Sequence, residues 1–264
     1  MGSASRSLTL MPIEMRAAWF LLPHQDDEVA ALYWIEEALS QGLDVRCSYF
    51  TQAPNAALNG RRNAESLNVL TRLGVRPENV SFEGMTLGIM DGEVQEHLNA
   101  LGCSLQDKLT SEHPEKIWIP AWEGGHPDHD ALHGAVVEIA TRAGILERVQ
   151  QFPFYNGWDC SGPWFKVMHP LTENGPVECR TLQWQQRLRY LMQCLKYPSQ
   201  AKTWLGLFPF VAAHLLFKGV QQAQRVQRER ILQRPHPGAL YYEKRAFSTW
   251  EKTQGKLAAW IKSL

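Results

Sequence analysis

The feature that most constrains the fold is an alternation of short apolar runs with helix-like segments over the first 145 residues. Each run has the length of a buried strand, and the segments that follow place their apolar residues at helical spacing. Strands are expected at 17–22, 44–51, 79–84 and 116–121, and helices at 28–41, 61–73, 94–109 and 129–143. This alternation is typical of βαβ units, so we predict an α/β fold with a Rossmann-like, mostly parallel sheet flanked by helices. No G-x-G-x-x-G motif follows the first run, so the phosphate cradle of dinucleotide-binding folds is missing.

The alternation weakens after about residue 155, where turn residues and longer apolar runs replace it. The expected elements are a loop over 156–176, a helix over 181–195, an apolar run over 203–217, a polar and basic helix over 221–233 and a strand over 238–247. We predict a single domain over 1–264, with a core of about 16–155 and a C-terminal extension or cap of about 156–264.

The composition excludes several classes of protein. The 27 basic and 27 acidic residues balance, so no overall field attracts nucleic acid, and we expect no nucleic-acid partner. The apolar segment 17–22 is too short for the hydrophobic region of a signal peptide, and no small-residue cleavage site follows it. The five cysteines are scattered, odd in number and without a C-x-x-C pair, although Cys160 and Cys179 remain a candidate pair. Reduced thiols and a cytoplasmic location are therefore expected.

A dense polar cluster begins where the first apolar run stops. His24, Asp26, Asp27 and Glu28 all lie within the segment LLPHQDDEVA. Carboxylates crowded in this way repel one another unless a positive charge lies among them, and a bound cation supplies that charge. The alternative interpretation is a helix start, where the helix dipole favours acidic residues.

A second cluster follows the fourth predicted strand. The segment EGGHPDHDALH holds five further candidate ligands, which are His126, Asp128, His129, Asp130 and His133. Both clusters follow strands, and the carboxyl ends of neighbouring parallel strands meet at one site. Alternatively, HPDH is only a turn with Pro127 in the first turn of a helix.

Together the two clusters fit an open metal site. Two histidines and one carboxylate bind zinc and leave the fourth position for water. His24 and Asp27 stand three residues apart on a tight turn and reach one metal, while His129 supplies the third ligand. Asp26 then points beside the metal, free to take a proton from the bound water.

These residues resemble a known family, the PIG-L/LmbE-like N-deacetylases. PHQDDE is similar to the family's P-H-P-D-D-E motif, with Gln25 in place of the second proline, and HPDH matches its second motif. RRNAESLNVLTRLGV (61–75) resembles the family's R-x-x-E helix, and GIMDGEV (88–94) resembles the turn whose aspartate meets a sugar hydroxyl. The likeness covers roughly residues 16–155.

The resemblance implies zinc-dependent removal of an acetyl group from an N-acetylated amino sugar, in a glycan, a glycolipid precursor or a glycoconjugate. His24, Asp27 and His129 would hold Zn²⁺, and Fe²⁺ or Co²⁺ bind the same ligands. Asp26 would be the general base. His126 would sit by the substrate carbonyl as an imidazolium that Asp128 orients and favours. Arg62 and Asp91 would contact the substrate.

Several of these residues also have simpler structural interpretations. Arg62 and Glu65 form an ion pair on one helix in the simpler case, and Asp91 is then an ordinary turn residue. Glu28 is interpreted as an acid in the first turn of a helix, and His133 as a packing residue rather than a rival ligand.

The run 203–217 also leaves two interpretations open. It is either a buried helix or a peripheral contact with the inner face of a membrane, flanked by Lys202 and Lys218. The identity and linkage of the sugar and the oligomeric state remain open.

Three other functions compete with deacetylation of an amino sugar. An amidase acting on a thiol-sugar conjugate or an antibiotic intermediate would use the same chemistry. A non-haem iron oxygenase uses a similar ligand set, but usually on a β-rich barrel. An inactive sugar-binding module would need neither Asp26 nor His126.

Overall fold

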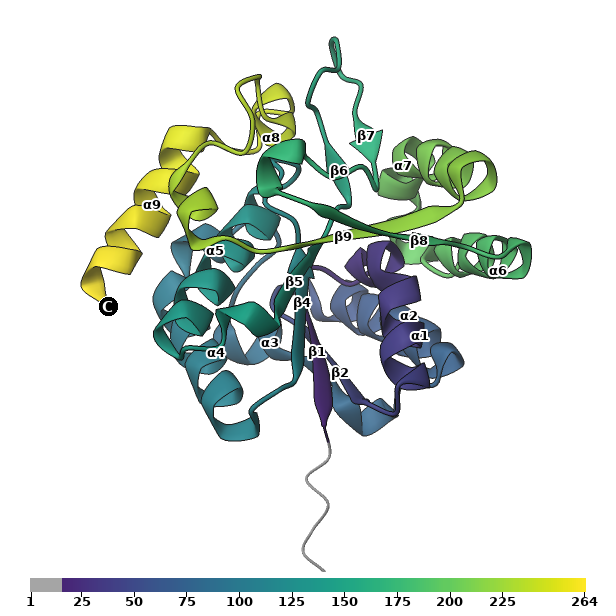
Figure 1. The fold of residues 1–264 in the computed structure, drawn as a ribbon, viewed down its shortest axis with the longest axis horizontal. Helices are drawn as coiled ribbons and strands as arrows, with labels where there is room; N and C mark the ends of the chain where they lie inside the picture. Colours follow the sequence, from purple (N-terminus) through teal and green to yellow (C-terminus); the bar gives the residue numbers. More distant parts are fainter. Residues whose placement is uncertain (1–15) are drawn as a thin grey trace, which may run out of the picture.

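A seven-stranded sheet forms the centre of the computed structural model, which describes residues 16–264 (Figure 1). Its strand order is β3-β2-β1-β4-β5-β9-β8. The five parallel strands are β1 (Ala17–Leu22), β2 (Asp44–Tyr49), β3 (Val80–Phe82), β4 (Lys116–Pro120) and β5 (Val149–Phe152). The antiparallel strands β9 (Val220–Arg225) and β8 (Val177–Thr181) extend it. The predicted Rossmann-like, mostly parallel sheet is confirmed.

The two central strands, β1 and β4, position the polar clusters that follow them. All six residues of β1 are buried, and β1 pairs in parallel with β2 on one side and β4 on the other. The chain builds outward from β1 to β3 and then returns to continue from β4, so the direction of winding changes between β1 and β4. Open α/β sheets bind ligands at such a switch point. The segments after β1 and β4, which carry the two polar clusters, therefore meet there.

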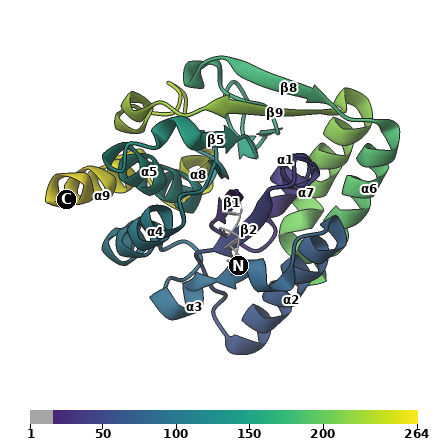
Figure 2. The ribbon, with the colours of Figure 1, turned by 60° about the horizontal axis from the view of Figure 1, so that its bottom comes forward.

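Helices cover both faces of the sheet and enclose two apolar cores (Figure 2). One core contains residues of α1 (Leu32–Ser40), α2 (Ala56–Leu73), α6 (Trp184–Cys194) and α7 (Ala201–Ala213). The other contains residues of α4 (Leu98–Glu112), α5 (Pro127–Arg142) and α9 (Trp250–Ser263). Helix α2 shows how local chemistry sets the bounds: Asn55 caps its start, and Gly74 ends it at a left-handed φ of 106°.

The helix predicted over 221–233 is wrong. That segment forms strand β9 followed by a short 3-10 turn, η8 (Arg228–Leu232). The polar side chains that suggested a surface helix are buried amides instead: Gln224 Nε2 donates to the carbonyl oxygens of Leu171 (2.9 Å) and Gly175 (2.7 Å). Hydrogen-bonded amides allow a polar sequence to form an interior strand.

The strand predicted over 238–247 is also wrong, because the segment forms a short helix, α8 (Tyr241–Lys244). The Glu243 carboxylate accepts hydrogen bonds from the backbone N–H of Leu240 (2.8 Å) and of Trp250 (3.0 Å). These bonds satisfy the amide at the helix start and tie the segment to the start of α9.

Other C-terminal elements were not predicted or differ in detail. The expected loop 156–176 contains nearly all of a small hairpin, β6 (Tyr155–Asn156) with β7 (Lys166–Val167), and a turn, η5 (Thr172–Asn174). The run 203–217 forms most of α7 and a π-helical turn, η7 (His214–Lys218). All five cysteines are free, so Cys160 and Cys179 are not joined.

Shorter elements complete the fold: α3 (Glu83–Leu87), η1 (Asp27–Ala31), η2 (Pro77–Asn79), η3 (Val94–Glu96), η4 (Leu146–Arg148) and η6 (Pro198–Gln200). Among residues 16–264, no helix has both the length and the apolar character needed to cross a bilayer. The first fifteen residues of the predicted single domain lie outside the described residues.

Candidate metal centre

The segment after β1 turns back on itself immediately. The Asp27 carboxylate accepts a hydrogen bond from the His24 backbone N–H (2.7 Å), and the Asp27 N–H donates to the His24 carbonyl (3.2 Å). Asp26 at the apex has a φ of 124°, a region that non-glycine residues seldom occupy. Such strain costs about 1–3 kcal/mol and persists only where the surroundings fix it. The turn presents the side chains of His24, Asp26 and Asp27 together.

The segment after β4 delivers the second set of side chains at the start of α5. His126 is the residue before the helix, and its Nδ1 accepts a hydrogen bond from the Asp128 backbone N–H (3.2 Å). Pro127 occupies the first helical position, as the turn interpretation of HPDH anticipated. His129 follows in the first turn and points toward the β1 loop, where its Nε2 lies 3.1 Å from Asp27 Oδ1.

His24, Asp27 and His129 form a buried group whose candidate ligand atoms all lie within 4.8 Å of one another. His24 Nδ1 lies 3.2 Å from Asp27 Oδ2. Neither ring nitrogen of His129 has a hydrogen-bond partner, although Nε2 lies close to Asp27. A buried imidazole without a partner is unusual, and a cation among these three residues would satisfy it. The residues therefore fit a metal.

A second group of possible ligands shares His24 with the first. His24 Nε2 lies 3.0 Å from Asp128 Oδ2 and 3.3 Å from Asp91 Oδ1, and His126 completes the group. The Asp128 carboxylate also accepts hydrogen bonds from the backbone N–H groups of Gly92 (2.6 Å) and Val94 (3.0 Å). Asp128 therefore joins the start of α5 to the loop that carries Asp91.

The electrostatics of the three-residue group favour an ionised Asp27. Burial alone would raise the pKa of Asp27, but positive charge on His129 and His24 holds it well below the usual range. For His24, burial acts to lower the pKa, and the carboxylates of Asp91 and Asp27 outweigh it and raise the pKa. The group thus pairs imidazoles with carboxylates at one buried point.

Asp26 lies beside this group in a different environment. Burial raises the pKa of its carboxyl well above the usual range, and the negative charges of Asp27 and Glu28 raise it further. Its Oδ2 accepts a hydrogen bond from Trp204 Nε1 of α7 (3.1 Å). A carboxylate that binds a proton more tightly than usual is a suitable proton acceptor.

His126 lies at the rim and differs from the expected imidazolium. Burial, followed by the positive charge of His24, lowers its pKa to about 4, so it is neutral at neutral pH. Its Nδ1 is 3.9 Å from the Asp128 carboxylate, which lies closer to His24. The backbone N–H of Asp128, rather than the carboxylate, therefore makes the hydrogen bond that orients the ring.

Arg62 and Asp91 are brought together at the exposed side of the site. Arg62 Nη1 lies 3.3 Å from Asp91 Oδ2, and 37% of the Asp91 side chain is exposed. Glu65 does not pair with Arg62, because it accepts hydrogen bonds from the backbone N–H (3.0 Å) and the hydroxyl of Ser199. The helix ion pair considered for Arg62 and Glu65 is therefore replaced by an ion pair between two candidate substrate-binding residues.

Residues from the C-terminal half contact the β1 loop, and the sequence patterns did not indicate them. Tyr197 donates from its hydroxyl to Glu28 Oε1 (2.7 Å), Gln200 donates to the Gln25 carbonyl, and Trp204 contacts Asp26. Glu28 is fully buried and bonded on both oxygens, so it is more than the first-turn acid expected there. No periodicity links positions so far apart in the chain, and only the tertiary fold pairs them.

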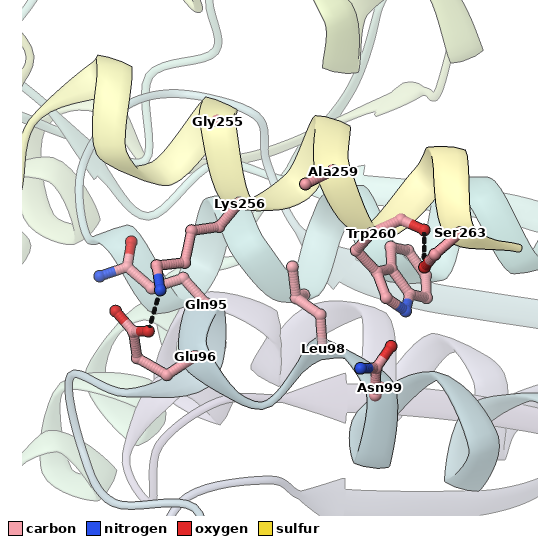
Figure 3. A pocket seen from close by; sticks show the side chains of 9 residues that line it. All are labelled: Gln95, Glu96, Leu98, Asn99, Gly255, Lys256, Ala259, Trp260 and Ser263. Carbon is pink, nitrogen blue, oxygen red and sulfur yellow. Dashed lines mark hydrogen bonds and ion pairs between the residues drawn. The ribbon is translucent and has the colours of Figure 1, made fainter.

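His133 and a surface groove lie apart from the three-residue group. The His133 ring is buried, and its Nδ1 lies 2.8 Å from the Pro120 carbonyl oxygen, as expected of a packing residue. The groove, of about 410 Å³, lies between η3, the start of α4 and helix α9 (Figure 3). Lys256 crosses it to donate to Glu96, and none of the residues predicted for the site lines it.

A comparison with known protein families matches the part of the chain that contains this site. Residues 19–140 match the family model of PIG-L, described as GlcNAc-PI de-N-acetylase. No curated protein matches the chain.

Solved structures of deacetylases have a similar fold. An antimicrobial pseudoaglycone deacetylase is 18% identical, with a TM-score of 0.60 over 80% of this chain and 97% of that one. A zinc-inhibited form of teicoplanin deacetylase is 15% identical, with a TM-score of 0.57 over 80% and 99%. N,N'-diacetylchitobiose deacetylase from Pyrococcus horikoshii is 14% identical, with a TM-score of 0.54 over 80% and 83%.

Proposed function

The chain belongs to the PIG-L family of N-deacetylases through its residues 19–140, and from this premise we propose that it removes the acetyl group of an N-acetylglucosamine-like sugar. The enzyme is a hydrolase of the N-deacetylase type, and sugar substrates suit its family and fold. The proposed substrate carries the acetamide within a glycan, a glycolipid precursor or a glycoconjugate. The observation that carries the proposal is the buried group of two imidazoles and one carboxylate with Asp26 beside it.

The proposed metal is zinc, held by His24, Asp27 and His129. Two imidazoles and one carboxylate leave a coordination position open, which is the arrangement of catalytic rather than structural zinc. Zinc supplies Lewis acidity, which lowers the pKa of a bound water toward ~7 and polarises an acyl carbonyl. Fe²⁺ and Co²⁺ remain alternative metals for the same ligands.

Asp26 is the proposed general base. Its raised pKa favours taking up the proton that the attacking water loses. The hydrogen bond from Trp204 occupies one lone pair of Oδ2 and fixes the direction of the carboxylate. The backbone of Asp26 is held at a φ of 124°, a strained conformation of the kind that clusters at active sites.

The remaining predicted residues are proposed to bind substrate. His126, neutral and at the rim, would hydrogen-bond the acetamide through its Nε2, because its Nδ1 is engaged by the Asp128 N–H. Asp128 would hold the Asp91 loop against α5 through the bonds it accepts from Gly92 and Val94. Arg62 and Asp91 would contact sugar hydroxyls from the exposed side of the site.

Release of acetate tests the proposal. The wild-type protein, stripped of metal and then reloaded with zinc, is incubated with a panel of N-acetylated sugars and sugar conjugates. We expect zinc-dependent release that Asp26→Ala abolishes while zinc binding is retained. Glu147→Gln, which changes an exposed carboxylate outside the site, should behave as wild type. If the zinc-loaded enzyme releases no acetate from any member of the panel, the proposed substrate class is wrong.

A second candidate substrate is an acylated antibiotic intermediate. The similar fold of the pseudoaglycone and teicoplanin deacetylases favours including such compounds in the panel. The chemistry would be the same, and only the group attached to the amine would differ. The mostly parallel sheet argues against a non-haem iron oxygenase, which usually has a β-rich barrel.

A further inference from the structure

Helix α6 carries an apolar stripe on its exposed side. Trp184, Leu188 and Met192 follow at intervals of four residues, and Leu195 follows three residues later; each is 43–56% exposed. Residues at this spacing share one side of a helix. The opposite side already packs into the core through Tyr190. Surface helices normally present charged side chains to water. This second apolar side, here called the α6 stripe, belongs to neither of the two apolar cores.

The neighbouring helix adds exposed apolar residues. Leu205 in α7 is 82% exposed, and Phe217 in the π-helical turn is 85% exposed. Arg187 connects the two elements, because its guanidinium carbon lies 5.7 Å from the Trp184 ring centre while its Nη1 donates to the Leu216 carbonyl (3.3 Å). Both views show α6 and α7 side by side at one edge of the molecule (Figures 1 and 2).

The charge of this region is one-sided although that of the whole chain is balanced. Between Glu178 and Glu229 the sequence has no acidic residue. The same interval holds eight basic residues: Arg180, Arg187, Arg189, Lys196, Lys202, Lys218, Arg225 and Arg228. Some pair with carboxylates of other elements, as Arg189 does with Glu36 (2.6 Å).

Five of these cations have no such partner. Within the described part of the chain, no carboxylate forms an ion pair with Arg187, Lys196, Lys202, Lys218 or Arg225. The exposed apolar residues are therefore accompanied by unneutralised positive charge.

We propose that the α6 stripe, together with Leu205 and Phe217, docks the protein on an anionic lipid bilayer. An amphipathic helix with a basic flank and a tryptophan lies in the plane of a membrane interface and is drawn there by anionic headgroups. A second copy of the chain fits less well, because a two-fold contact would place the unpaired cations of one copy against the same cations of the other.

The docking surface is continuous with the segment that contacts the metal centre. Tyr197, Gln200 and Trp204, which lie between the end of α6 and the first turn of α7, make the hydrogen bonds to the β1 loop. A bilayer bound at α6 would thus lie next to the part of the molecule that holds Asp26 in place. The surface itself does not depend on what reaction the site performs.

Co-sedimentation with vesicles tests the proposal on the full chain. Vesicles of phosphatidylcholine alone are compared with vesicles that also contain phosphatidylglycerol. We expect binding only to the mixed vesicles, weakening as salt rises. The double variant Leu188→Gln/Met192→Gln should lower the partition coefficient about tenfold, because it removes apolar area that the bilayer would otherwise bury. Met85→Gln, which changes an equally exposed apolar residue on α3, is the matched control and should bind as wild type.

A charge variant and a mass measurement complete the test. Lys202→Gln/Lys218→Gln should reduce binding to mixed vesicles and flatten its salt dependence, and thermal unfolding checks that each variant is folded. Equal binding by wild type and the double variant, or no binding to mixed vesicles, overturns the proposal. A lipid-free dimer seen by light scattering and lost in Leu188→Gln/Met192→Gln would instead identify a contact between copies. Acetate release from soluble sugars, measured on the same variants, reports separately on the proposed function.

Discussion

The two halves of the molecule contribute to the site in different ways. Residues up to the first turn of α5 supply every proposed metal ligand, and parallel strands fix their positions through the backbone. The C-terminal half supplies hydrogen bonds from side chains, with Trp204, Tyr197 and Gln200 contacting the loop after β1. The first half therefore supplies the side chains that could bind a metal. The second half supplies hydrogen bonds that fix the loop after β1, which carries two of those side chains.

Removing one of the proposed metal ligands should have the largest effect, because the first half of the chain would then no longer form a complete metal site. His129→Ala leaves His24 and Asp27 as two ligands, which are too few for a catalytic zinc site. We expect zinc binding to be lost and kcat/KM to fall by at least about 10³-fold, a scale comparable to removing a major electrostatic contribution to catalysis. Zinc content by elemental analysis and acetate release measure the two effects. Full zinc content in His129→Ala would show that the second group of ligands, around Asp128, holds the metal.

The next largest effect should be a pH-dependent loss of stability that arises from His133 in the first half. Burial lowers the pKa of His133 to about 4, so the folded protein keeps this ring neutral where the unfolded chain protonates it. The contribution is fully present above the unfolded pKa of about 6.5 and is lost as pH falls toward 4. Between pH 6.5 and pH 5 the loss amounts to about 1.5 kcal/mol of unfolding free energy.

His133→Asn tests this contribution, because asparagine replaces the ring with a group that does not titrate but still donates to the Pro120 carbonyl. Urea unfolding at the two pH values should show a smaller decrease for His133→Asn than for wild type. Equal decreases would mean that the ring is not held neutral in the folded protein.

The smallest effect should come from the C-terminal half and would sharpen the comparison most. Trp204→Phe keeps an aromatic ring but removes the hydrogen bond to Asp26. We expect kcat to fall about tenfold, equivalent to about 1.4 kcal/mol, while zinc content and KM stay unchanged. Trp184→Phe makes the same chemical change on an exposed tryptophan and serves as the control. Loss of zinc from Trp204→Phe would show that the second half also contributes to metal binding, contrary to the comparison above.

The sequence allowed the first half to be predicted because local patterns determine it. The bounds of β1 were predicted at both ends, since a short apolar run with polar residues on either side has few alternatives. The approach of His24, Asp27 and His129 followed from the rule that neighbouring parallel strands end at one edge of the sheet.

The second half was harder to predict because long-range contacts determine it. Gln221 and Gln224 are buried in β9 through hydrogen bonds that no local pattern indicates, so their polar character suggested a surface helix. The contact of Trp204 with Asp26 was missed for the same reason. Its partner Asp26 lies 178 positions earlier, and the sequence pattern marked Trp204 only as part of an apolar run.

The strand order has a consequence for synthesis of the chain on the ribosome. All three proposed ligands have been made once residue 129 is added, and the parallel strands are complete at Phe152. The free edge of β5, however, pairs with β9, which ends only at Arg225. For more than seventy residues of translation the nascent sheet therefore carries an open edge, which is a template for wrong pairing. Once β9 has been made it covers this edge, so the last third of the chain closes the sheet as well as contacting the loop after β1.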